Sequence, residues 1–308
     1  MAKLVFIGLG TMGAPMTTRL VAAGHELNVS DASPEVARTV AETSGASVAD
    51  PHEAVGEADA VFLMLPNSDI VAAVLGFRDD PQSLASKIRR GTVVVDMGSS
   101  RPDATRVHAD DLAHGGVAFV DAPVSGGPRR AETGELSIMV GINDDEVWNA
   151  IAPILGALGT NVSRTGLVGS AHALKALNNL LSVIGIVGAL EVLTVGTKFG
   201  LDPAVMLEVI NHSTGRNHAT EVKLGPHVLD RQWNVGFSLG LTVKDVTTAL
   251  HLAESQSVAT PVSHAAVAVA VAALDSFAGT PADQSQIAQY IEALNGVTLG
   301  RPDSEEHS

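Results

Sequence analysis

Short apolar runs alternate with helical stretches through the first half of the chain. The runs are rich in valine, isoleucine and phenylalanine and are bounded by glycine, proline or aspartate, as buried strands are. They lie at residues 3–8, 26–31, 60–65, 92–97, 118–123 and 136–141, with a shorter run at 161–166. Strands that alternate with helices pair in parallel through crossover connections. The pattern therefore predicts an α/β fold with a doubly wound parallel sheet.

The pattern changes at about residue 169, after which long segments rich in alanine, leucine and valine follow helical spacing. The longest segment, residues 169–200, contains no proline and ends at a glycine, a common helix stop. A helix of this length would extend roughly 45 Å. We therefore expect a second, all-α domain opened by a long interdomain helix. The expected boundaries are 1–165, 166–298 and, for a flexible acidic tail, 299–308.

Composition narrows the range of partners. The formal net charge of −15 opposes binding to nucleic acid or to an anionic membrane surface, because both need a concentrated basic face. The absence of cysteine excludes disulfides and thiolate metal ligands, and it fits a reducing cytoplasm. Glycines interrupt the apolar N-terminus, so we expect no secretion signal, and we expect no apolar stretch clean enough to span a bilayer. Small molecules remain as ligands of a soluble protein.

A glycine-rich turn follows the first predicted strand and precedes a helical run. It reads G-x-G-x-x-G. In this motif the first glycine permits a tight turn, the second lets a pyrophosphate approach the backbone, and the third allows the helix to pack closely on the strand. Free N–H groups at the start of the helix favour an anion. The motif predicts that a dinucleotide binds at Gly8, Leu9, Gly10, Thr11, Met12 and Gly13.

Asp31 ends the second predicted strand, about 20 residues after the glycine-rich turn. A carboxylate there accepts hydrogen bonds from ribose hydroxyls and repels a 2′-phosphate, and Ala32 and Ser33 supply no arginine to offset that repulsion. NAD is therefore favoured over NADP. The alternative is an ordinary glycine turn with a solvent-facing aspartate.

The third predicted strand ends in Leu65, Pro66 and Asn67. Ligands of open α/β sheets bind at the carboxyl ends of the strands, so these residues are further candidates for contact with the cofactor. A plain turn at the end of a strand is the alternative explanation.

Lys175 is the main candidate for proton transfer. It lies in the apolar helical run SAHALKALNNLL, where burial of a lone lysine is costly unless it is paired or deprotonated. Asn178 and Asn179 follow at i+3 and i+4, so one or both share its face. Lys244 and Asp245 suggest a second internal charge, in another apolar helical run. Alternatively, Lys175 extends to solvent from a domain boundary and the asparagines bridge helices.

Ser125, Gly126 and Gly127 follow the fifth predicted strand, in the segment DAPVSGGP. A serine with two glycines can present a hydroxyl and backbone N–H groups to a carboxylate, because no larger side chain obstructs them. The same residues also form ordinary turns, so both interpretations stay open.

The chain resembles the β-hydroxyacid dehydrogenases, which include 3-hydroxyisobutyrate dehydrogenase and tartronate semialdehyde reductase. The motifs that carry the resemblance occur in the family's order: GLGTMGAPM, MLP, DAPVSGG, the G-x-x-x-x-x-K-x-x-N-N run at 169–179, and LTVKD. The resemblance implies an N-terminal Rossmann domain, an all-helical second domain, and an active site in the cleft between them. It also implies a homodimer or homotetramer.

The resemblance further implies a role for each candidate. By position, Lys175 matches the catalytic lysine, Asn179 and Asn178 match substrate-binding asparagines, residues 125–127 match the substrate-carboxylate loop, and Lys244 matches a lysine near the nicotinamide and substrate. Asp245 would orient Lys244 or its helix.

Three segments depart from the family's pattern and leave the substrate open. In DMGSSRP a glycine replaces one hydroxyl residue, so Ser99 alone can supply that contact. Arg129 and Arg130 follow the glycine pair, and they either bind a second anionic group of the substrate or lie on the surface. In STGRNHAT, His218 replaces an aromatic residue, and it and Arg216 either line the pocket or cap a helix.

These residues lead to one main hypothesis. The chain transfers a hydride between NAD(H) and a small 3-hydroxy acid or its semialdehyde, with Lys175 as general acid/base. A catalytically silent NAD-binding scaffold and an imine reductase of the same architecture are the alternatives. Lys175 and the two asparagines favour carbonyl chemistry, because imine reductases carry a different proton donor at the lysine position.

Overall fold

Two compact units make up the chain in the computed structural model, which describes residues 1–301. The first unit is Met1–Lys175, and the second begins at Ala176. Residues 302–308, most of the expected acidic tail, lie outside the described residues. Leu299, at the expected start of the tail, is fully buried, and its backbone N–H donates to Oε1 of Glu292 at 2.6 Å. The packed chain therefore continues beyond residue 298.

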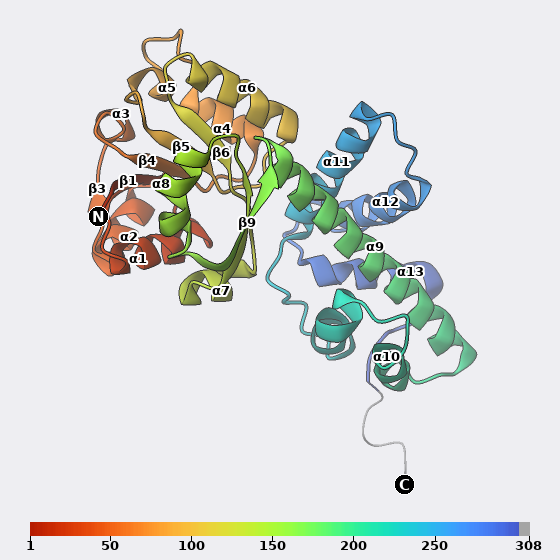
Figure 1. Cartoon of the computed structure of the whole chain (residues 1–308). Coiled ribbons are helices and arrows are strands. Elements are labelled where there is room, and N and C mark those ends of the chain that lie inside the picture. The colour runs from red at the N-terminus through yellow and green to blue at the C-terminus, as the bar shows by residue number, and fades with distance from the viewer. Residues whose placement is uncertain (302–308) are drawn as a thin grey trace. The chain divides into compact units, whose positions relative to one another are not determined.

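A nine-stranded sheet forms the centre of the first unit (Figure 1). Its strands are β1 (Lys3–Ile7), β2 (Glu26–Ser30), β3 (Ser47–Val48), β4 (Ala60–Leu63), β5 (Val93–Asp96), β6 (Ala118–Asp121), β7 (Val124–Ser125), β8 (Leu136–Gly141) and β9 (Gly159–Gly166). Their order is β3-β2-β1-β4-β5-β6-β8-β7, with β9 paired to β8. Every predicted strand is present, and the doubly wound α/β fold is confirmed.

Strand direction divides the sheet into two parts. The strands from β3 to β6 run parallel, as expected. In contrast, β8 runs antiparallel to β6 and β7, which corrects the expectation of a fully parallel sheet. A parallel pair needs a crossover of about a dozen residues or more. The chain between β6 and β8 is instead divided between β7 and the short helix α7 (Gly127–Thr133).

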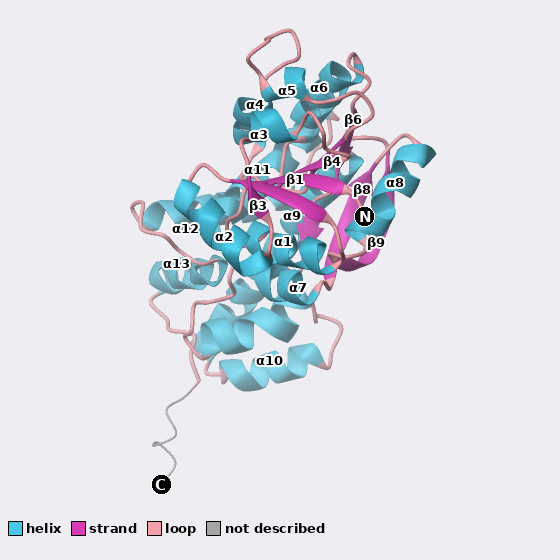
Figure 2. Cartoon of the chain, turned by 90° about the vertical axis from the view of Figure 1, so that its left-hand side faces the viewer, coloured by secondary structure: helices cyan, strands magenta, loops and turns pink. Residues whose placement is uncertain are grey.

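Helices cover both faces of this sheet (Figure 2). Successive residues of β1 point to opposite faces, so Phe6 packs in one core with Met16 of α1, whereas Val5 packs in the other with Val71 of α4. The helices of this unit, besides α7, are α1 (Gly13–Ala22), α2 (Pro34–Ser44), α3 (Pro51–Ala54), α4 (Ser68–Leu75), α5 (Leu84–Lys87), α6 (Pro102–Ala113) and α8 (Asp145–Leu155). Burial on both faces explains why the strands read as continuous apolar runs.

The second unit consists of helices around one apolar core, as predicted. Its elements are α9 (Ser170–Phe199, which begins in the first unit), α10 (Pro203–Asn211), η1 (Ala219–Leu229), α11 (Leu239–Ser255), α12 (Pro261–Ser276), η2 (Gln284–Gln286) and α13 (Ile287–Asn295). Val183 and Leu190 of α9 share this core with Val246 of α11 and Ile291 of α13. The element η1 is a π-helix with Pro226 inside it, which the sequence pattern does not predict.

The long helix α9 corrects the expectation that no stretch of the chain is apolar enough to span a membrane. In length and composition it is apolar enough to cross a membrane, the one helix of residues 1–301 that meets both criteria. Core helices of soluble proteins meet the same criteria, and in α9 the residues at positions 183, 186, 190 and 193 are buried in the core of the second unit. One face of α9 therefore packs as a core helix does.

Candidate active site

The glycine-rich turn leaves β1 where the strand order reverses, because β1 lies between β2 and β4. Such a switch point is where open α/β sheets bind ligands. Gly8 has a φ of +99°, and a Cβ on it would overlap the carbonyl oxygen of Met64. A Cβ on Gly13 would overlap the carbonyl oxygen of Gly8, whereas one on Gly10 would meet no heavy atom within 4 Å. Packing thus requires Gly8 and Gly13, and Gly10 leaves open space beside the backbone.

The start of α1 is suited to an anion. Its N-cap residue, Met12, supplies no side-chain acceptor, and the first turn contains no acidic residue. The N–H groups of a first helical turn carry partial positive charge. Thr11 is exposed beside this turn, whereas the side chain of Leu9 is buried. The open space at Gly10 and these N–H groups fit the pyrophosphate of a dinucleotide.

Asp31 lies beside the same turn. Its Oδ2 accepts a hydrogen bond of 2.7 Å from the backbone N–H of Leu9, and its Oδ1 accepts one of 2.9 Å from the N–H of Ser33. The two bonds fix the carboxylate against the turn, and each oxygen keeps acceptor capacity for a ribose hydroxyl. Neither Ala32 nor Ser33 brings a positive charge to it. The acceptor oxygens of Asp31, with no positive charge beside them, fit the ribose hydroxyls of NAD.

The loop after β4 meets both the glycine-rich turn and the loop after β5, because a Cβ on Gly8 or on Gly98 would contact Leu65. Leu65 packs against Gly8 with its side chain. Asn67 caps α4, because its Oδ1 accepts from the N–H groups of Asp69 and Ile70 at 3.0 and 2.9 Å. Asn67 therefore caps a helix, which agrees with the alternative of a plain turn at the end of a strand. A contact between Asn67 and the cofactor would be a second role. In the loops after β4 and β5, Pro66 is exposed and Ser99 is half-buried.

The segment Ser125 to Gly127 turns from β7 into α7 with a backbone that only glycine adopts readily. Gly126 has a φ of +134° and Gly127 a φ of +71°. A Cβ on Gly127 would meet no heavy atom within 4 Å, and Ser125 is half-buried. The side chain of Arg130 packs on Gly126. The turn is therefore open enough to offer a hydroxyl and N–H groups to a small anion.

A buried polar cluster anchors the start of α9 to the sheet. The Oδ1 of Asp121, at the end of β6, accepts from the N–H of Gly169 at 2.8 Å, and its Oδ2 accepts from the N–H of His172 at 2.9 Å. The His172 ring bonds Thr105 through Nδ1 at 2.7 Å, and its Nε2 lies 3.8 Å from Oδ2 of Asp96, at the end of β5. The sequence does not single out Asp121, whose one signal is an acidic residue at the end of an apolar strand.

This anchor places Lys175 one turn further along α9. Lys175 is half-buried, and Asn178 and Asn179 follow it at helical spacing. Nδ2 of Asn178, an exposed residue, donates to Oδ1 of Asn179 at 3.3 Å. Lys175 therefore lies one helical turn beyond His172, whose backbone N–H bonds to Asp121 at the end of β6.

The second unit holds Asn179 through an ion pair. Asn179 Nδ2 donates to Oδ2 of Asp245 at 2.6 Å, and Oδ1 of Asp245 lies 3.0 Å from Nζ of Lys244. Asp245 is only 2% exposed, so its charge needs both partners. The structure therefore joins Asn179 to Lys244 and Asp245, a pair that the sequence pattern selects separately from Asn179.

The sequence pattern does not predict one polar cluster of the second unit. Lys223 of η1 donates to Oγ of Ser182 at 3.2 Å and to Oε1 of Gln284 at 2.7 Å. Ser182 follows Asn179 by three residues and so continues the same face of α9. The signal in the sequence is a serine at helical spacing from Asn179. Lys223 carries no signal, because only folding brings it to α9.

The remaining basic candidates are more exposed. Arg129 and Arg130 lie exposed on α7, and Arg216 and His218 are exposed before η1.

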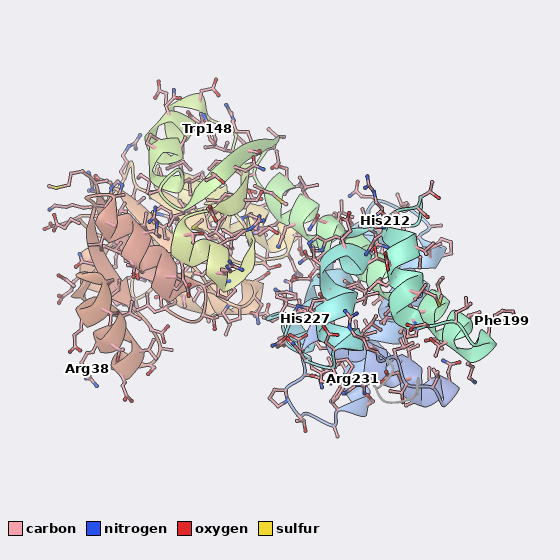
Figure 3. The ribbon with its side chains drawn as sticks, turned by 90° about the horizontal axis from the view of Figure 1, so that it is seen from below. Arg38, Trp148, Phe199, His212, His227 and Arg231 are labelled. Carbon is pink, nitrogen blue, oxygen red and sulfur yellow. The ribbon has the colours of Figure 1, made fainter. Side chains whose placement is uncertain are left out.

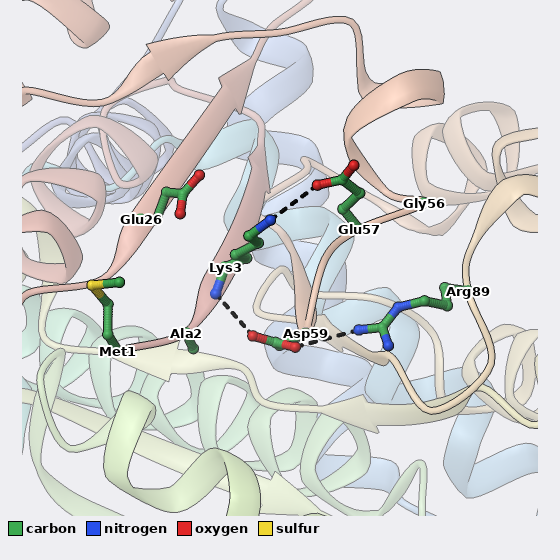
Figure 4. Close-up of a pocket in the computed structure, with 8 residues that line it drawn as sticks. All are labelled: Met1, Ala2, Lys3, Glu26, Gly56, Glu57, Asp59 and Arg89. Carbon is green, nitrogen blue, oxygen red and sulfur yellow. Dashed lines mark hydrogen bonds and ion pairs between the residues drawn. The ribbon is translucent and has the colours of Figure 1, made fainter.

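A separate open pocket lies at the opposite edge of the sheet, where β1 begins (Figure 4). Its charged side chains are paired, because Lys3 Nζ lies 3.0 Å from Glu57 and Arg89 lies 3.3 Å from Asp59. This edge carries the amino ends of the strands, whereas open α/β sheets bind ligands at the carboxyl ends. We therefore assign it no part in the candidate site.

Comparison with known proteins identifies both units. Residues 3–166 match the family model for the NAD binding domain of 6-phosphogluconate dehydrogenase, and residues 169–291 match that for the NAD-binding of NADP-dependent 3-hydroxyisobutyrate dehydrogenase. The chain is 35% identical over 299 residues to 2-(hydroxymethyl)glutarate dehydrogenase of Eubacterium barkeri, covering 96% of this chain and 97% of the relative. Human mitochondrial 3-hydroxyisobutyrate dehydrogenase is 32% identical over 257 residues, which are 81% of this chain and 75% of the relative.

Solved structures agree with these matches. The Mycobacterium tuberculosis 3-hydroxyisobutyrate dehydrogenase solved with L-serine aligns with a TM-score of 0.84 at 28% identity, covering 96% of this chain and 99% of that one. An imine reductase from Myxococcus stipitatus shares the fold at 18% identity and a TM-score of 0.64, over 94% of this chain and 99% of that one. The chain therefore belongs to the β-hydroxyacid dehydrogenase family that includes 3-hydroxyisobutyrate dehydrogenase.

Proposed function

We propose that the protein is an NAD-dependent dehydrogenase that interconverts a small 3-hydroxy acid and its semialdehyde. The observation that carries the proposal is the placement of Lys175, one turn beyond the buried anchor of α9 and one turn before Asn179. The relatives named above support it, because their names describe hydroxyacid dehydrogenases. NAD, when bound, accepts a hydride from the hydroxyl-bearing carbon and returns it in the reverse direction.

The residues of this chain have distinct tasks in that reaction. The turn at residues 8–13 holds the pyrophosphate and Asp31 holds the ribose, with Leu65, Pro66, Asn67 and Ser99 as further cofactor contacts. Ser125, Gly126 and Gly127 bind the substrate carboxylate. Asn178, Asn179 and Lys244 bind and orient the substrate, and Lys244 also lies near the nicotinamide.

Lys175 moves the proton. In oxidation its neutral amine accepts the hydroxyl proton while the carbon loses a hydride, so one C–H and one O–H bond break and a carbonyl forms. In reduction the ammonium returns the proton to the carbonyl oxygen. Asn179 holds that oxygen beside Nζ, and Asp245 fixes Asn179 in place.

A fluorescence screen for NADH tests the function. Short 3-hydroxy acids are supplied with NAD, including acids that carry a second anionic group, and semialdehydes and cyclic imines are supplied with NADH. We expect turnover of at least one hydroxy acid. Binding of NADH without turnover of any compound would identify a silent scaffold, and turnover of imines alone would identify an imine reductase.

The choice of cofactor depends on Asp31. Asp31→Asn keeps an acceptor for the N–H of Leu9 but removes the negative charge, so we expect the ratio of kcat/KM for NADP to that for NAD to rise about tenfold. Steady-state kinetics with both cofactors measure it. Asp50→Asn, at an exposed helix cap, is the matched control. An unchanged ratio in Asp31→Asn would remove Asp31 from cofactor selection.

The protein is also proposed to form a homodimer or homotetramer in the cytoplasm, a location with which a chain free of cysteine is compatible. Exposed apolar side chains on α9 support self-association. Val195 is 70% exposed and Phe199 is 84% exposed, and Phe199 lies at the end of α9 in Figure 3. Leu181 and Val192 lie on the same face by helical spacing. Such a stripe on a surface marks an interaction site.

Charge on this stripe should weaken the association. We expect Leu181→Glu combined with Val195→Glu to shift the protein to a smaller species in sedimentation velocity, because two buried carboxylates would face an apolar partner. Val107→Glu, at an exposed valine of α6, should leave the mass unchanged. The same oligomer in both variants would place the interface elsewhere.

A further inference from the structure

We propose that the ring of His172 carries a proton on both nitrogens, and that its positive charge favours the neutral, proton-accepting amine of Lys175 one turn further along α9. The proposal rests on the proposed function of Lys175 and adds the group that tunes its protonation. The side chain of His172 is fully buried, so it acts on the reaction through Lys175, as a positioning residue.

The first step of the argument is the direction of one hydrogen bond. The hydroxyl of Thr105 donates its single proton to the carbonyl oxygen of Arg101 at 3.0 Å, one helical turn back along the chain. The same Oγ1 of Thr105 lies 2.7 Å from Nδ1 of His172. Because a hydroxyl has one proton to give, the ring nitrogen must supply the proton of this second bond. Nδ1 of His172 is therefore protonated.

The second step concerns the other ring nitrogen. Nε2 of His172 is buried and has no hydrogen-bond partner within residues 1–301. It lies 3.8 Å from Oδ2 of Asp96, and Oδ2 of Asp121 lies 4.0 Å from Nδ1. A neutral ring protonated on Nδ1 would leave the lone pair of Nε2 beside the carboxylate of Asp96, where the two repel each other. A proton on Nε2 makes both contacts attractive.

The third step is the charge of the two carboxylates. Asp96 and Asp121 are both fully buried. Asp96 accepts the N–H of Gly98 at 2.9 Å and the hydroxyl of Ser100 at 2.6 Å, and Asp121 accepts two backbone N–H groups at the start of α9. Hydrogen bonds to both oxygens favour the ionised form of a carboxyl group. Two buried negative charges are costly without a cation, and the ring of His172 lies within 4.0 Å of both.

Two further ionisable groups near the ring lie on α6. Burial lowers the pKa of His108, although Asp96 opposes this effect, so His108 is neutral at neutral pH. Arg106 is exposed, and its side chain packs on Gly169. Its charge is screened by solvent, as exposed charges are. His172 is thus the group placed to balance the two aspartates from inside the unit.

The positive charge has a consequence for Lys175. The two residues are three apart on α9, and side chains at this spacing begin about 5–6 Å from each other. A nearby positive charge disfavours a second one, so it lowers the pH at which the amine loses its proton. His172→Gln removes the charge but keeps an N–H group for Thr105. The amine of Lys175 should then become neutral only at a higher pH.

Competitive labelling with acetic anhydride measures this pH, because only the neutral amine reacts. Mass spectrometry of the peptide that contains Lys175 gives the pH of half-maximal labelling. We expect His172→Gln to raise it by about one pH unit, as for the loss of a charge nearby in a partly buried site. His108→Gln, at a second buried histidine that is neutral, is the matched control and should leave it unchanged. The thermal midpoint of each variant shows whether it folds. An unchanged pH of half-labelling in folded His172→Gln, or an equal change in both variants, would overturn the proposal.

Nuclear magnetic resonance of the unmodified protein tests the ring directly and needs neither turnover nor a folded variant. In long-range ¹H–¹⁵N spectra the two nitrogens of an imidazolium have similar frequencies, whereas those of a neutral ring lie far apart. The signal of His172 is the one that His172→Gln or, if that variant does not fold, His172→Asn removes. We expect similar frequencies at neutral pH. Widely separated frequencies would overturn the proposal and leave the proposed function intact, whereas full activity of Lys175→Ala would overturn the proposed function and leave the charge of the ring intact.

Discussion

Replacement of Lys175 by alanine should lower kcat by about 10³-fold or more, within the range that a positioned general acid/base contributes. The amine is the proposed acceptor of the hydroxyl proton, and the alanine variant has no group at that position to replace it. The anchor of α9 uses Asp121, His172 and backbone N–H groups, none of which the substitution removes. NADH affinity should therefore remain within a few-fold of the original, as measured by fluorescence titration.

Two comparisons make this result specific to proton transfer. Lys198→Ala removes an exposed lysine from the same helix and should leave kcat unchanged. Lys175→Arg keeps the positive charge but cannot act as a base near neutral pH, so it should be nearly as inactive as the alanine variant. Retention of more than a tenth of kcat in Lys175→Ala would remove this lysine from the mechanism.

The second large effect is expected at Gly13. Its Cβ would overlap the carbonyl oxygen of Gly8, so Gly13→Ala must push α1 away from the end of β1. We expect NADH affinity to fall by more than 100-fold and the free energy of unfolding to fall by about 1–3 kcal/mol, the usual cost of overpacking. Fluorescence titration and urea denaturation measure the two effects.

Gly10→Ala is the informative partner of that variant. A Cβ on Gly10 meets no heavy atom within 4 Å, so the free energy of unfolding should stay within about 0.5 kcal/mol of the original. The methyl group would nevertheless occupy the space proposed for the pyrophosphate, and NADH affinity should fall at least tenfold. Unchanged NADH affinity in Gly10→Ala would show that the phosphates bind elsewhere.

The parts of the fold that sequence predicts are those with strong local patterns. β1, β4 and β5 are buried on both faces, so each reads as an unbroken apolar run. α9 is recognisable because a long apolar segment without proline ends at Gly200. The pattern does not predict β3 and β7, because two-residue strands are too short to show a period, nor the antiparallel direction of β8, which depends on the path of the connecting chain.

The residues of the candidate site also fall into two groups: those related by position along the chain and those that only folding brings together. The glycine-rich turn and Asp31 are adjacent to strand ends, so their meeting follows from the order of elements along the chain. Lys175 and Asn179 share a helix face by spacing alone. Asp121 and His172 are 51 positions apart, and Asn179 and Asp245 are 66 apart, so no local period relates them.

By itself the sequence determined the strands, the long helix, the dinucleotide turn and the lysine with its two asparagines, because each depends on residues that are neighbours in the chain. Only the tertiary structure decided what holds these residues in place. The buried carboxylate of Asp121 needs N–H donors from the start of α9, and Lys223 reaches α9 only because η1 and η2 pack beside it. A buried charge is stabilised by the partners that the fold places beside it, and the local spacing of residues does not predict those partners.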